Sequence, residues 1–374
     1  MAAPPDRREE LEDKLAKVRG WLERTGAAAA VLGSQGAFAW ITGGGDNHVS
    51  LGHEEGAAAV LVTPTRACVL AANNELSRIV DEEVAGLPLE PVTWPWHQPS
   101  QARSLIDRLA GPGPVVADLG QLGLARADAS LTALRFTLRA SEVERYRRLG
   151  ADAAAAVEAA CAEARPGQRE RDVAARVVLA CAARGIIPLV VLVAGDERIA
   201  RYRHPQPTDY RWQRTLLVAL TGRRHGLHAS LTRMVSARAP DATLAARFRA
   251  VQRVDAAMLL ASRPGASLGD VLARGQAQYA AEGFPDEWTL HHQGGLTGYA
   301  GRERFAVPGE ALALAAAQVV AWNPSITSVK SEDTALVTDA GIELLTTTSR
   351  WPRDRVDLHD GVVERPALMV SESS

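Results

Sequence analysis

The sequence predicts a protein of the α/β class with two domains. Its 374 residues are enough for two or three domains. Helical and strand patterns alternate in the first third of the chain, and a helix-starting segment at 140–144 marks a seam after it. The 47% hydrophobic and 23% charged residues are typical of a globular protein with a sizeable core.

The first domain is predicted from short apolar runs that lie next to glycines. Apolar residues such as Leu11, Leu15 and Val18 recur at helical spacing before these runs. The expected elements are, in order, a helix at 9–25, a strand at 27–32, a glycine-rich loop, a strand at 57–62, one further strand, a helix at 102–109 and a strand at 115–117. Between the first two strands, the glycines at 43–45 permit positive φ angles and favour a tight turn.

The second domain is predicted to open with a helix and to contain a β-hairpin. Ser141 is expected to cap that helix, with Glu144 as the capping-box partner. The expected elements are helices at 141–164 and 170–184, strands at 188–194, 215–221 and 229–236, helices at 244–262 and 268–282, and strands at 318–322 and 334–338.

Charge and composition exclude several classes of partner. A formal charge of −2 gives no basic surface for nucleic acid or for a membrane. No apolar run approaches the roughly 18–20 residues of a membrane span. The first ten residues lack the apolar core of a secretory signal, and the three cysteines are scattered and odd in number. We therefore expect a cytoplasmic protein with free thiols and with neither nucleic acid nor a membrane as a partner.

Local strings throughout the second domain match one family of hydrolases. The matching segments are 203–209, 216–233, 291–303, 322–326 and 329–334. On these segments the chain resembles the pita-bread family, which includes Xaa-Pro aminopeptidases, prolidases, methionine aminopeptidases and creatinase. The resemblance implies a creatinase-type α/β domain at 1–137. It implies a pita-bread α+β domain at 138–374, with a curved, mainly antiparallel sheet and the site in its concavity.

The family's dinuclear metal ligands are mostly replaced in this chain. By the resemblance, Ala219 and Ser230 stand where metal-binding members carry Asp, Gly295 stands for the metal His, and Asn323 stands for a Glu. Only Glu332 matches the ligand set. Divalent cations of this class need several carboxylate oxygens. We therefore expect no metal and no other cofactor.

Three residues are predicted to be catalytic by the same resemblance. His204 matches the imidazole that does the acid–base work in metal-free creatinase, and imidazole has an unperturbed pKa near neutrality. Glu332 is the retained carboxylate, and Glu303 matches the family's acid after the glycine-rich turn. Two alternatives remain open: a backbone-bonded loop histidine at 204, and a simple salt bridge from Glu332 to Lys330.

A further set of residues is predicted to contact the substrate. Arg302 can hold a carboxylate or a phosphate through two parallel hydrogen bonds, or else pair with Glu303 or Glu310. His228 shares a strand face with Ser230 and is expected on the wall of the site, with relocated metal ligation as the alternative. The full set is His291, His292, Arg302, Tyr299, Asn323, Ser230 and His228.

Three functions compete on this evidence. The first is a metal-independent, creatinase-like hydrolase or lyase that acts on a C–N bond of a small polar substrate, such as an amino acid, amide or guanidino compound. The second is a metallopeptidase of the Xaa-Pro aminopeptidase or prolidase type with a rebuilt metal site. The third is a non-catalytic pita-bread binding protein. The resemblance also implies a homodimer in which Asp46, Asn47 and His48 reach the partner's site.

Overall fold

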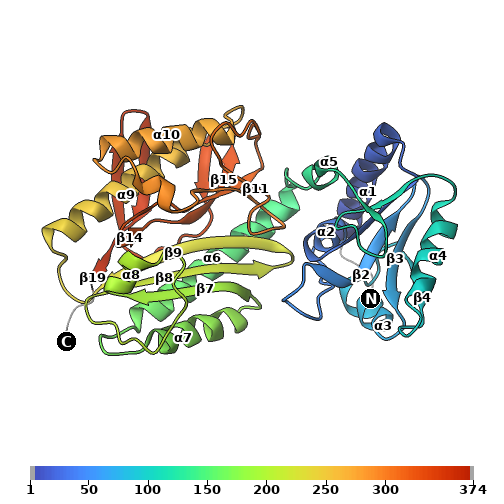
Figure 1. The fold of residues 1–374 in the computed structure, drawn as a ribbon, viewed down its shortest axis with the longest axis horizontal. Helices are drawn as coiled ribbons and strands as arrows, with labels where there is room; N and C mark the ends of the chain where they lie inside the picture. The colour runs from blue at the N-terminus through green and yellow to red at the C-terminus, as the bar shows by residue number, and fades with distance from the viewer. Residues whose placement is uncertain (1–4, 371–374) are drawn as a thin grey trace. The chain divides into compact units, whose positions relative to one another are not determined.

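The structure is a computed structural model that describes residues 5–370 (Figure 1). Residues 1–4, part of the segment considered as an export signal, lie outside the described residues, as do residues 371–374. The chain divides into two compact α/β units, and the division falls after Glu142, slightly beyond the predicted boundary at 137. The segment His225–Leu227 groups with the first unit. The predicted fold class, a mixed α/β chain with two domains, is confirmed.

The first unit is built on a six-stranded mixed sheet with the order β4-β3-β2-β1-β5-β6. The strands are β1 (Ala29–Ser34), β2 (Glu55–Val62), β3 (Ala67–Ala72), β4 (Glu90–Trp94), β5 (Val115–Ala117) and β6 (Ala125–Arg126). β2 runs antiparallel to β1 and to β3, and the other pairs are parallel. Every residue of β1 is buried, as expected for an apolar run that is covered on both faces.

The first unit contains the two predicted helices and several short helices that the sequence patterns did not predict. They are α1 (Pro5–Thr25), α2 (Gln35–Ile41), α3 (Leu76–Arg78), the short π-helix η1 (Ile79–Glu83), α4 (Ser100–Ala110) and α5 (Ala129–Ala133). Helix α2 starts where the Ser34 side chain accepts a hydrogen bond from Ala37 N, an N-cap. Gly43 and Gly44 follow it with φ angles of +68° and +103°, so the predicted tight turn is present.

Asn47 is part of the interior of the first unit. Its side chain is fully buried, and its amide donates to the carbonyl oxygens of Ala58 at 2.6 Å and Gly33 at 3.2 Å. The predicted reach of this loop to a partner subunit therefore rests on Asp46 and His48. The homodimer stays a prediction.

The second unit contains two main sheets. One has the order β19-β9-β8-β7 and the other the order β11-β10-β12-β15-β16, with antiparallel pairing throughout the second. The strands of the first are β7 (Ile187–Gly195), β8 (Thr215–Arg224), β9 (Leu227–Ser236) and β19 (Met369–Val370). Those of the second are β10 (Gly294–Thr297), β11 (Arg304–Phe305), β12 (Val319–Trp322), β15 (Asp333–Thr338) and β16 (Gly341–Leu344). An antiparallel bridge between Thr232 and Glu332 joins the two sheets.

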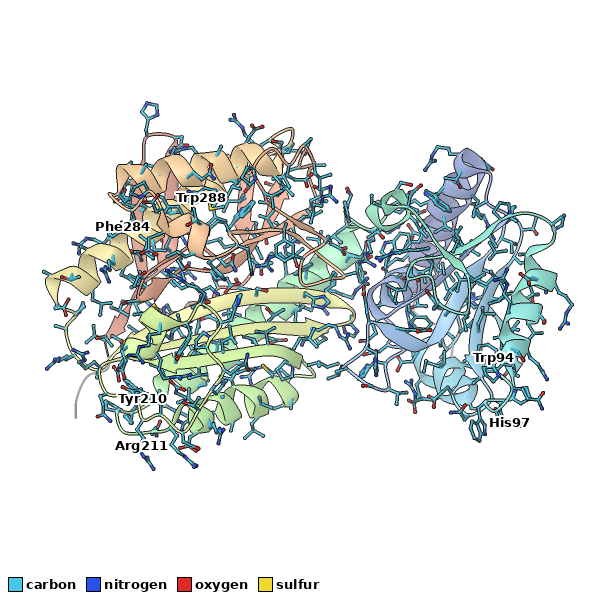
Figure 2. All side chains as sticks on the ribbon, viewed as in Figure 1. Trp94, His97, Tyr210, Arg211, Phe284 and Trp288 are labelled. Carbon is cyan, nitrogen blue, oxygen red and sulfur yellow. The ribbon has the colours of Figure 1, made fainter. Side chains whose placement is uncertain are left out.

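The remaining elements of the second unit surround these sheets, and side chains fill the spaces between them (Figure 2). The helices are α6 (Ala140–Ala162), α7 (Glu170–Ala182), α8 (Glu197–Arg201), α9 (Ala242–Ala261), α10 (Leu268–Ala281) and the 3₁₀-helix η2 (Glu287–Leu290). Short strand pairs are β13 (Ser325–Ile326) with β14 (Val329–Lys330), and β17 (Arg353–Leu358) with β18 (Gly361–Pro366). No described helix is long and apolar enough to cross a membrane.

The predicted cap of helix α6 is wrong. Ser141 lies inside the helix, and its hydroxyl donates to Glu10 Oε2 at 2.8 Å. Glu142 instead accepts from the backbone N–H of Arg139 at 2.8 Å. Ser141 does not cap the helix because its hydroxyl is bound by the carboxylate of Glu10, which lies on helix α1 and is distant in sequence.

Candidate functional site

A cavity of about 500 Å³ in the second unit collects most of the predicted site residues. Its walls come from β7, β8 and the loops around residues 204, 292 and 302. The lining residues are Leu189, Val190, Leu192, His204, Gln206, Ala219, Leu220, Thr221, His228, His292, Gly301, Arg302, Phe305, Asn323, Lys330 and Glu332. An apolar wall thus faces a small number of convergent polar groups, the usual composition of a small-molecule site.

Three imidazoles converge at one side of this cavity. The Nε2 atoms of His204 and His291 are 3.0 Å apart. The ring centroid of His292 lies 4.5 Å from that of His291 and 5.5 Å from that of His204. His291 is buried, whereas His204 and His292 are partly exposed, with the rest of each ring covered by the protein. The pair at 204 and 291 is therefore in hydrogen-bond contact at a place that solvent reaches.

Contacts away from the cavity hold the segments that carry these histidines. Arg203 pairs with Glu287 of η2 at 2.7 Å, which ties the loop before His204 to the segment before His291. The buried Gln293 amide donates to the carbonyl oxygens of His291 at 2.6 Å and of Trp288, labelled in Figure 2, at 3.1 Å.

Tyr279 on helix α10 in turn donates to the Gln293 side-chain oxygen at 2.9 Å. Motif matching missed Gln293 and Tyr279. The one feature of the sequence that could have indicated them is a polar side chain at a position that is expected to be buried.

All three imidazoles are held neutral near pH 7. Burial lowers the pKa of His291 to about 2, with the charge of Lys330 adding to the effect. Burial and the Arg302 guanidinium lower the pKa of His292 to about 4. The pKa of His204 is also lowered, by burial first and by Lys330 second. Each ring therefore keeps a lone pair for a proton or another acceptor of electrons.

The cavity is also lined by one carboxylate and two cations. Glu332 Oε2 lies 2.7 Å from Lys330 Nζ and accepts from Thr232 Oγ1 at 2.7 Å, and Glu332 Oε1 lies 3.6 Å from Arg302 Nη2. Burial alone would raise the pKa of the Glu332 carboxyl, but Lys330 and Arg302 hold it below its usual value. Glu332 is therefore ionised. The alternative of a salt bridge with Lys330 is present in the structure.

Three buried polar atoms at the site have no hydrogen-bond partner among the described residues. They are Arg302 Nε, Asn323 Oδ1 and His291 Nδ1. Arg302 makes one good hydrogen bond, from Nη1 to Gly301 O at 2.7 Å, and burial lowers the pKa of its guanidinium. An unsatisfied buried polar group costs about 1–3 kcal/mol. A bound polar ligand would remove this cost.

The remaining predicted residues take different positions. His228 lines the cavity with Nδ1 3.3 Å from Gly298 O. Ser230 is buried behind the wall, with its hydroxyl 2.9 Å from that of Thr221 and 3.5 Å from Arg302 Nη1.

Tyr299 and Glu303 are not among the residues that line the cavity. Tyr299 is 2% exposed, and its backbone N–H donates to Glu303 Oε1 at 3.0 Å. The structure therefore gives Glu303 a partner in the glycine-rich turn. Thr232, by contrast, touches Glu332 and was missed. Its signal is that it lies two residues after Ser230, on the same face of β9.

The donor set does not fit the dinuclear metal centre of the resembling family. Ala219 offers no ligand atom, and the Glu332 carboxylate is already bound by a lysine, an arginine and a threonine. Gly295 has a φ angle of +148°, and a Cβ added there would lie 2.1 Å from Arg304 O. The backbone of β10 therefore excludes a histidine at this position without a shift of β11.

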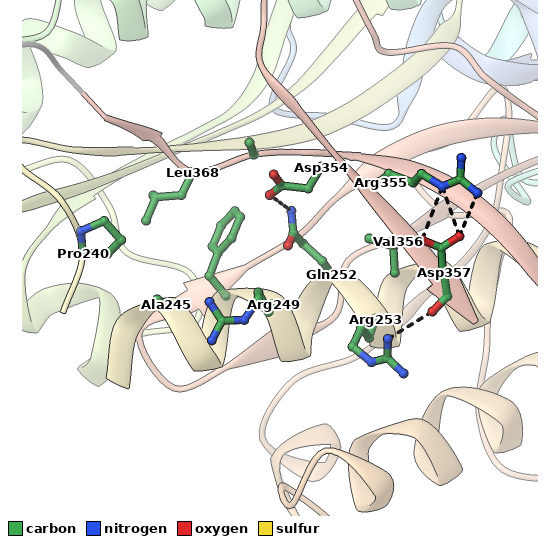
Figure 3. A pocket seen from close by; sticks show the side chains of 12 residues that line it. Pro240, Ala245, Arg249, Gln252, Arg253, Asp354, Arg355, Val356, Asp357 and Leu368 are labelled. Carbon is green, nitrogen blue, oxygen red and sulfur yellow. Dashed lines mark hydrogen bonds and ion pairs between the residues drawn. The ribbon is translucent and has the colours of Figure 1, made fainter. Parts of the chain in front are cut away.

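A second cavity, of about 560 Å³, lies between α9 and the β17–β18 hairpin (Figure 3). Most of its polar side chains form hydrogen bonds or ion pairs with other residues that line it. Gln252 donates to Asp354 at 2.8 Å, Arg355 pairs with Asp357 at 3.0 Å, and Arg253 donates to Asp357 O at 3.1 Å. No histidine or cysteine lines it. The histidine-lined cavity is therefore the better candidate for chemistry.

Comparison with known proteins places the second unit in a family. The model of metallopeptidase family M24 matches residues 144–339. No curated protein sequence matches the chain.

Three solved structures illustrate the likeness of the fold. The dipeptidase PepE from Mycobacterium ulcerans is 21% identical, with 97% of this chain and 98% of that chain covered and a TM-score of 0.76. The prolidase from Pyrococcus furiosus is 19% identical, with 89% of this chain and 100% of that chain covered and a TM-score of 0.73. The N-terminal domain of the FACT complex subunit SPT16 from chickpea is 13% identical, with 90% of this chain and 96% of that chain covered and a TM-score of 0.66. At these identities the likeness shows the fold alone.

Proposed function

The chain belongs to metallopeptidase family M24, and from that premise we propose that it hydrolyses an amide C–N bond of a small, carboxylate-bearing substrate without the family's dinuclear centre. One observation carries the proposal. A single cavity brings neutral imidazoles in hydrogen-bond contact next to a pair of cations that share one carboxylate. Binding and proton transfer thus have separate groups in one place.

The cationic side of the cavity is suited to bind the substrate carboxylate. Lys330 and Arg302 together carry two positive charges, and Glu332 supplies one negative charge. The Arg302 Nε–H has no partner and is buried, so it can complete a two-point contact with a carboxylate. Glu332 then acts as the counter-ion that holds both cations in place. This role replaces the acid–base role expected from the sequence.

The imidazole side is suited to move the proton. His204 is exposed and neutral, so it can take a proton from a water molecule that attacks the substrate carbonyl. The C–N bond then breaks, and the proton passes from His204 to the leaving nitrogen, which yields a carboxylic acid and an amine. His291 resists protonation because it is buried. It therefore orients His204 through the Nε2–Nε2 hydrogen bond.

Two other functions are supported by specific observations. The fold similarity to prolidases and dipeptidases favours a metallopeptidase with a rebuilt metal site. A binding protein without turnover is the second alternative, because the donor set does not fit the family's dinuclear centre. Both lead to measurements that differ from those of the proposed hydrolase.

The test is amine release from dipeptides, N-acyl amino acids and guanidino acids by chelator-treated protein. We expect His204→Ala to lower kcat by about 10²–10⁴-fold, while His359→Ala, an exposed histidine of the same unit, has no effect. Arg302→Gln should raise KM for a substrate with a free carboxylate and leave its carboxamide analogue unchanged. Full activity in His204→Ala would overturn the mechanism. Binding without turnover would favour the binding protein, and activity only after metal addition would favour the metallopeptidase.

A further inference from the structure

We propose that His204, His291 and His292 form a binding site for a single Zn²⁺-like ion, and that this ion inhibits the enzyme instead of activating it. The inhibition rests on the proposed hydrolase, because an ion bound to His204 Nε2 leaves the ring proton on Nδ1 and so leaves His204 no lone pair with which to act as a base. The binding itself does not depend on that function. Such a site differs in residues and in donor chemistry from the carboxylate-rich centre of the family.

The positions of the three donors suit one metal ion. Each residue offers one ring nitrogen, and the three nitrogens all lie within 4.8 Å of one another. The His204 and His291 Nε2 atoms are 3.0 Å apart. Two nitrogens bound tetrahedrally to zinc at about 2.0–2.1 Å are separated by roughly 3.3 Å. A shift of a few tenths of an ångström would bring these two nitrogens to ligand spacing. A larger turn of the exposed His292 ring would bring in the third nitrogen, which lies within 4.8 Å of the other two.

An unsatisfied acceptor beside the cluster fits a bound positive group. His291 Nδ1 has no hydrogen-bond partner among the described residues, so no contact on that side prevents His291 Nε2 from carrying the lone pair. Asn323 Nδ2 lies 3.5 Å from His292 Nδ1, and Asn323 Oδ1 has no partner.

With the amide turned over, Asn323 Oδ1 would accept from His292 Nδ1–H and leave Nε2 as a donor to the ion. A carbonyl oxygen behind a ligand histidine is the usual outer contact in zinc sites.

The donor types predict which ions bind. Imidazole suits Zn²⁺, Co²⁺, Ni²⁺ and Cu²⁺, whereas Mg²⁺ and Mn²⁺ prefer carboxylate and water oxygens. The only carboxylate among the cavity's lining residues is Glu332, and it is held by Lys330 and Arg302. These two cations also repel a dication, so Lys330→Met should strengthen binding of the ion.

The experiment measures ion binding to the full, chelator-treated chain without any substrate. Isothermal titration with Zn²⁺, together with the visible absorption of bound Co²⁺, should give one ion per chain, and Mn²⁺ should give none. His291→Ala and His292→Gln should each weaken binding at least about tenfold. His228→Ala, a histidine of the same cavity outside the cluster, should leave binding unchanged. Circular dichroism confirms that each variant is folded, and the exposed His292 keeps the test valid if His291→Ala does not fold.

Each outcome decides the proposal. No Zn²⁺ binding, two ions per chain, or binding that survives His292→Gln would overturn the site. If the chain proves to be a hydrolase, Zn²⁺ should inhibit it over the same concentrations at which it binds, and activation by Zn²⁺ would overturn the inhibitory role. A chain that binds the ion but hydrolyses no substrate would refute the proposed function and leave the site intact.

Discussion

Two neighbouring residues, Glu332 and Asp333, belong to ion networks of opposite composition. On the cavity side, Glu332 is the one carboxylate between Lys330 and Arg302. On the core side, Asp333 belongs to a network of two arginines and three acids, made of Arg233, Arg365, Glu158, Asp255 and Asp333. Successive residues of an extended segment face opposite sides, so one short stretch of chain supplies both networks.

Burial and net charge distinguish the network that stabilises the fold from the network that can bind a ligand. In the core, Arg365 lies 2.5 Å from Asp255 and 2.7 Å from Asp333, and all three side chains are at most 1% exposed. The three acids outnumber the two arginines there. Burial raises the pKa of Asp255 to about 6, so this carboxyl takes up a proton more readily and the excess negative charge is reduced. In the cavity network the excess charge is positive and the three side chains line an open cavity, so an anionic ligand can balance that charge. The core network fixes the fold, and the cavity network is left ready for a ligand.

The largest expected effect is at Arg365. Arg365→Met leaves Asp255 and Asp333 buried without their shared partner, and should lower the free energy of unfolding by about 3–5 kcal/mol. Urea denaturation followed by circular dichroism measures this loss. Arg355→Met, at an exposed arginine of the same hairpin, is the matched control and should change stability by less than about 0.5 kcal/mol. If both variants lowered the free energy of unfolding equally, the buried ion pairs of Arg365 would stabilise the fold no more than the exposed pair of Arg355.

The next effect concerns the backbone beside the cavity. Gly295→Ala places a Cβ against Arg304 O at a φ angle of +148°, and should lower the free energy of unfolding by about 2–3 kcal/mol. Gly301 lines the same cavity with no atom within 4 Å of its added Cβ. Gly301→Ala should therefore be nearly neutral. If Gly295→Ala were equally neutral, the backbone would not exclude the family's metal histidine.

A smaller effect links the core network to pH. The pKa of Asp255 is about 6 in the folded state, whereas that of an ordinary aspartate is 3.8. Between these pH values the folded protein therefore holds a proton that the unfolded chain has released. The contribution of Asp255 to stability therefore falls as pH rises from about 4 to about 6. Compared with Asp255→Asn, the wild type should lose on the order of 2 kcal/mol over this range. A difference that stays constant, or that grows with pH, would contradict the raised pKa.

The smallest expected effect is at Arg302, and it gives the sharpest contrast with Arg365. Arg302→Met removes a guanidinium whose charge burial already disfavours, while Lys330 and Thr232 still hold Glu332. We expect the free energy of unfolding to change by less than about 1 kcal/mol, measured in the same urea series. A loss as large as that in Arg365→Met would show that Arg302 is a structural residue instead of a ligand-binding one.

Much of the fold follows from sequence periodicity. The helices α1, α6, α7, α9 and α10 and the β8–β9 hairpin lie where the spacing of apolar residues predicts them. Periodicity works there because a buried face repeats every turn or every second residue. It missed helix α2, which is short and almost wholly buried, and misplaced the role of Ser141, whose partner Glu10 is far away in sequence. Short or fully buried elements carry no alternation for a pattern to detect.

The sequence by itself determined the family and the residue types at the site, such as the histidines at 204, 291 and 292. Only the tertiary structure decided which groups meet. It joins His204 to His291 across 87 residues, pairs Arg302 with Glu332 while Glu310 pairs with Arg304, and closes the space beside Gly295. The reason is physical: spacing along the chain fixes which face a side chain occupies, but its partners come from loops whose placement depends on the packing of the whole unit.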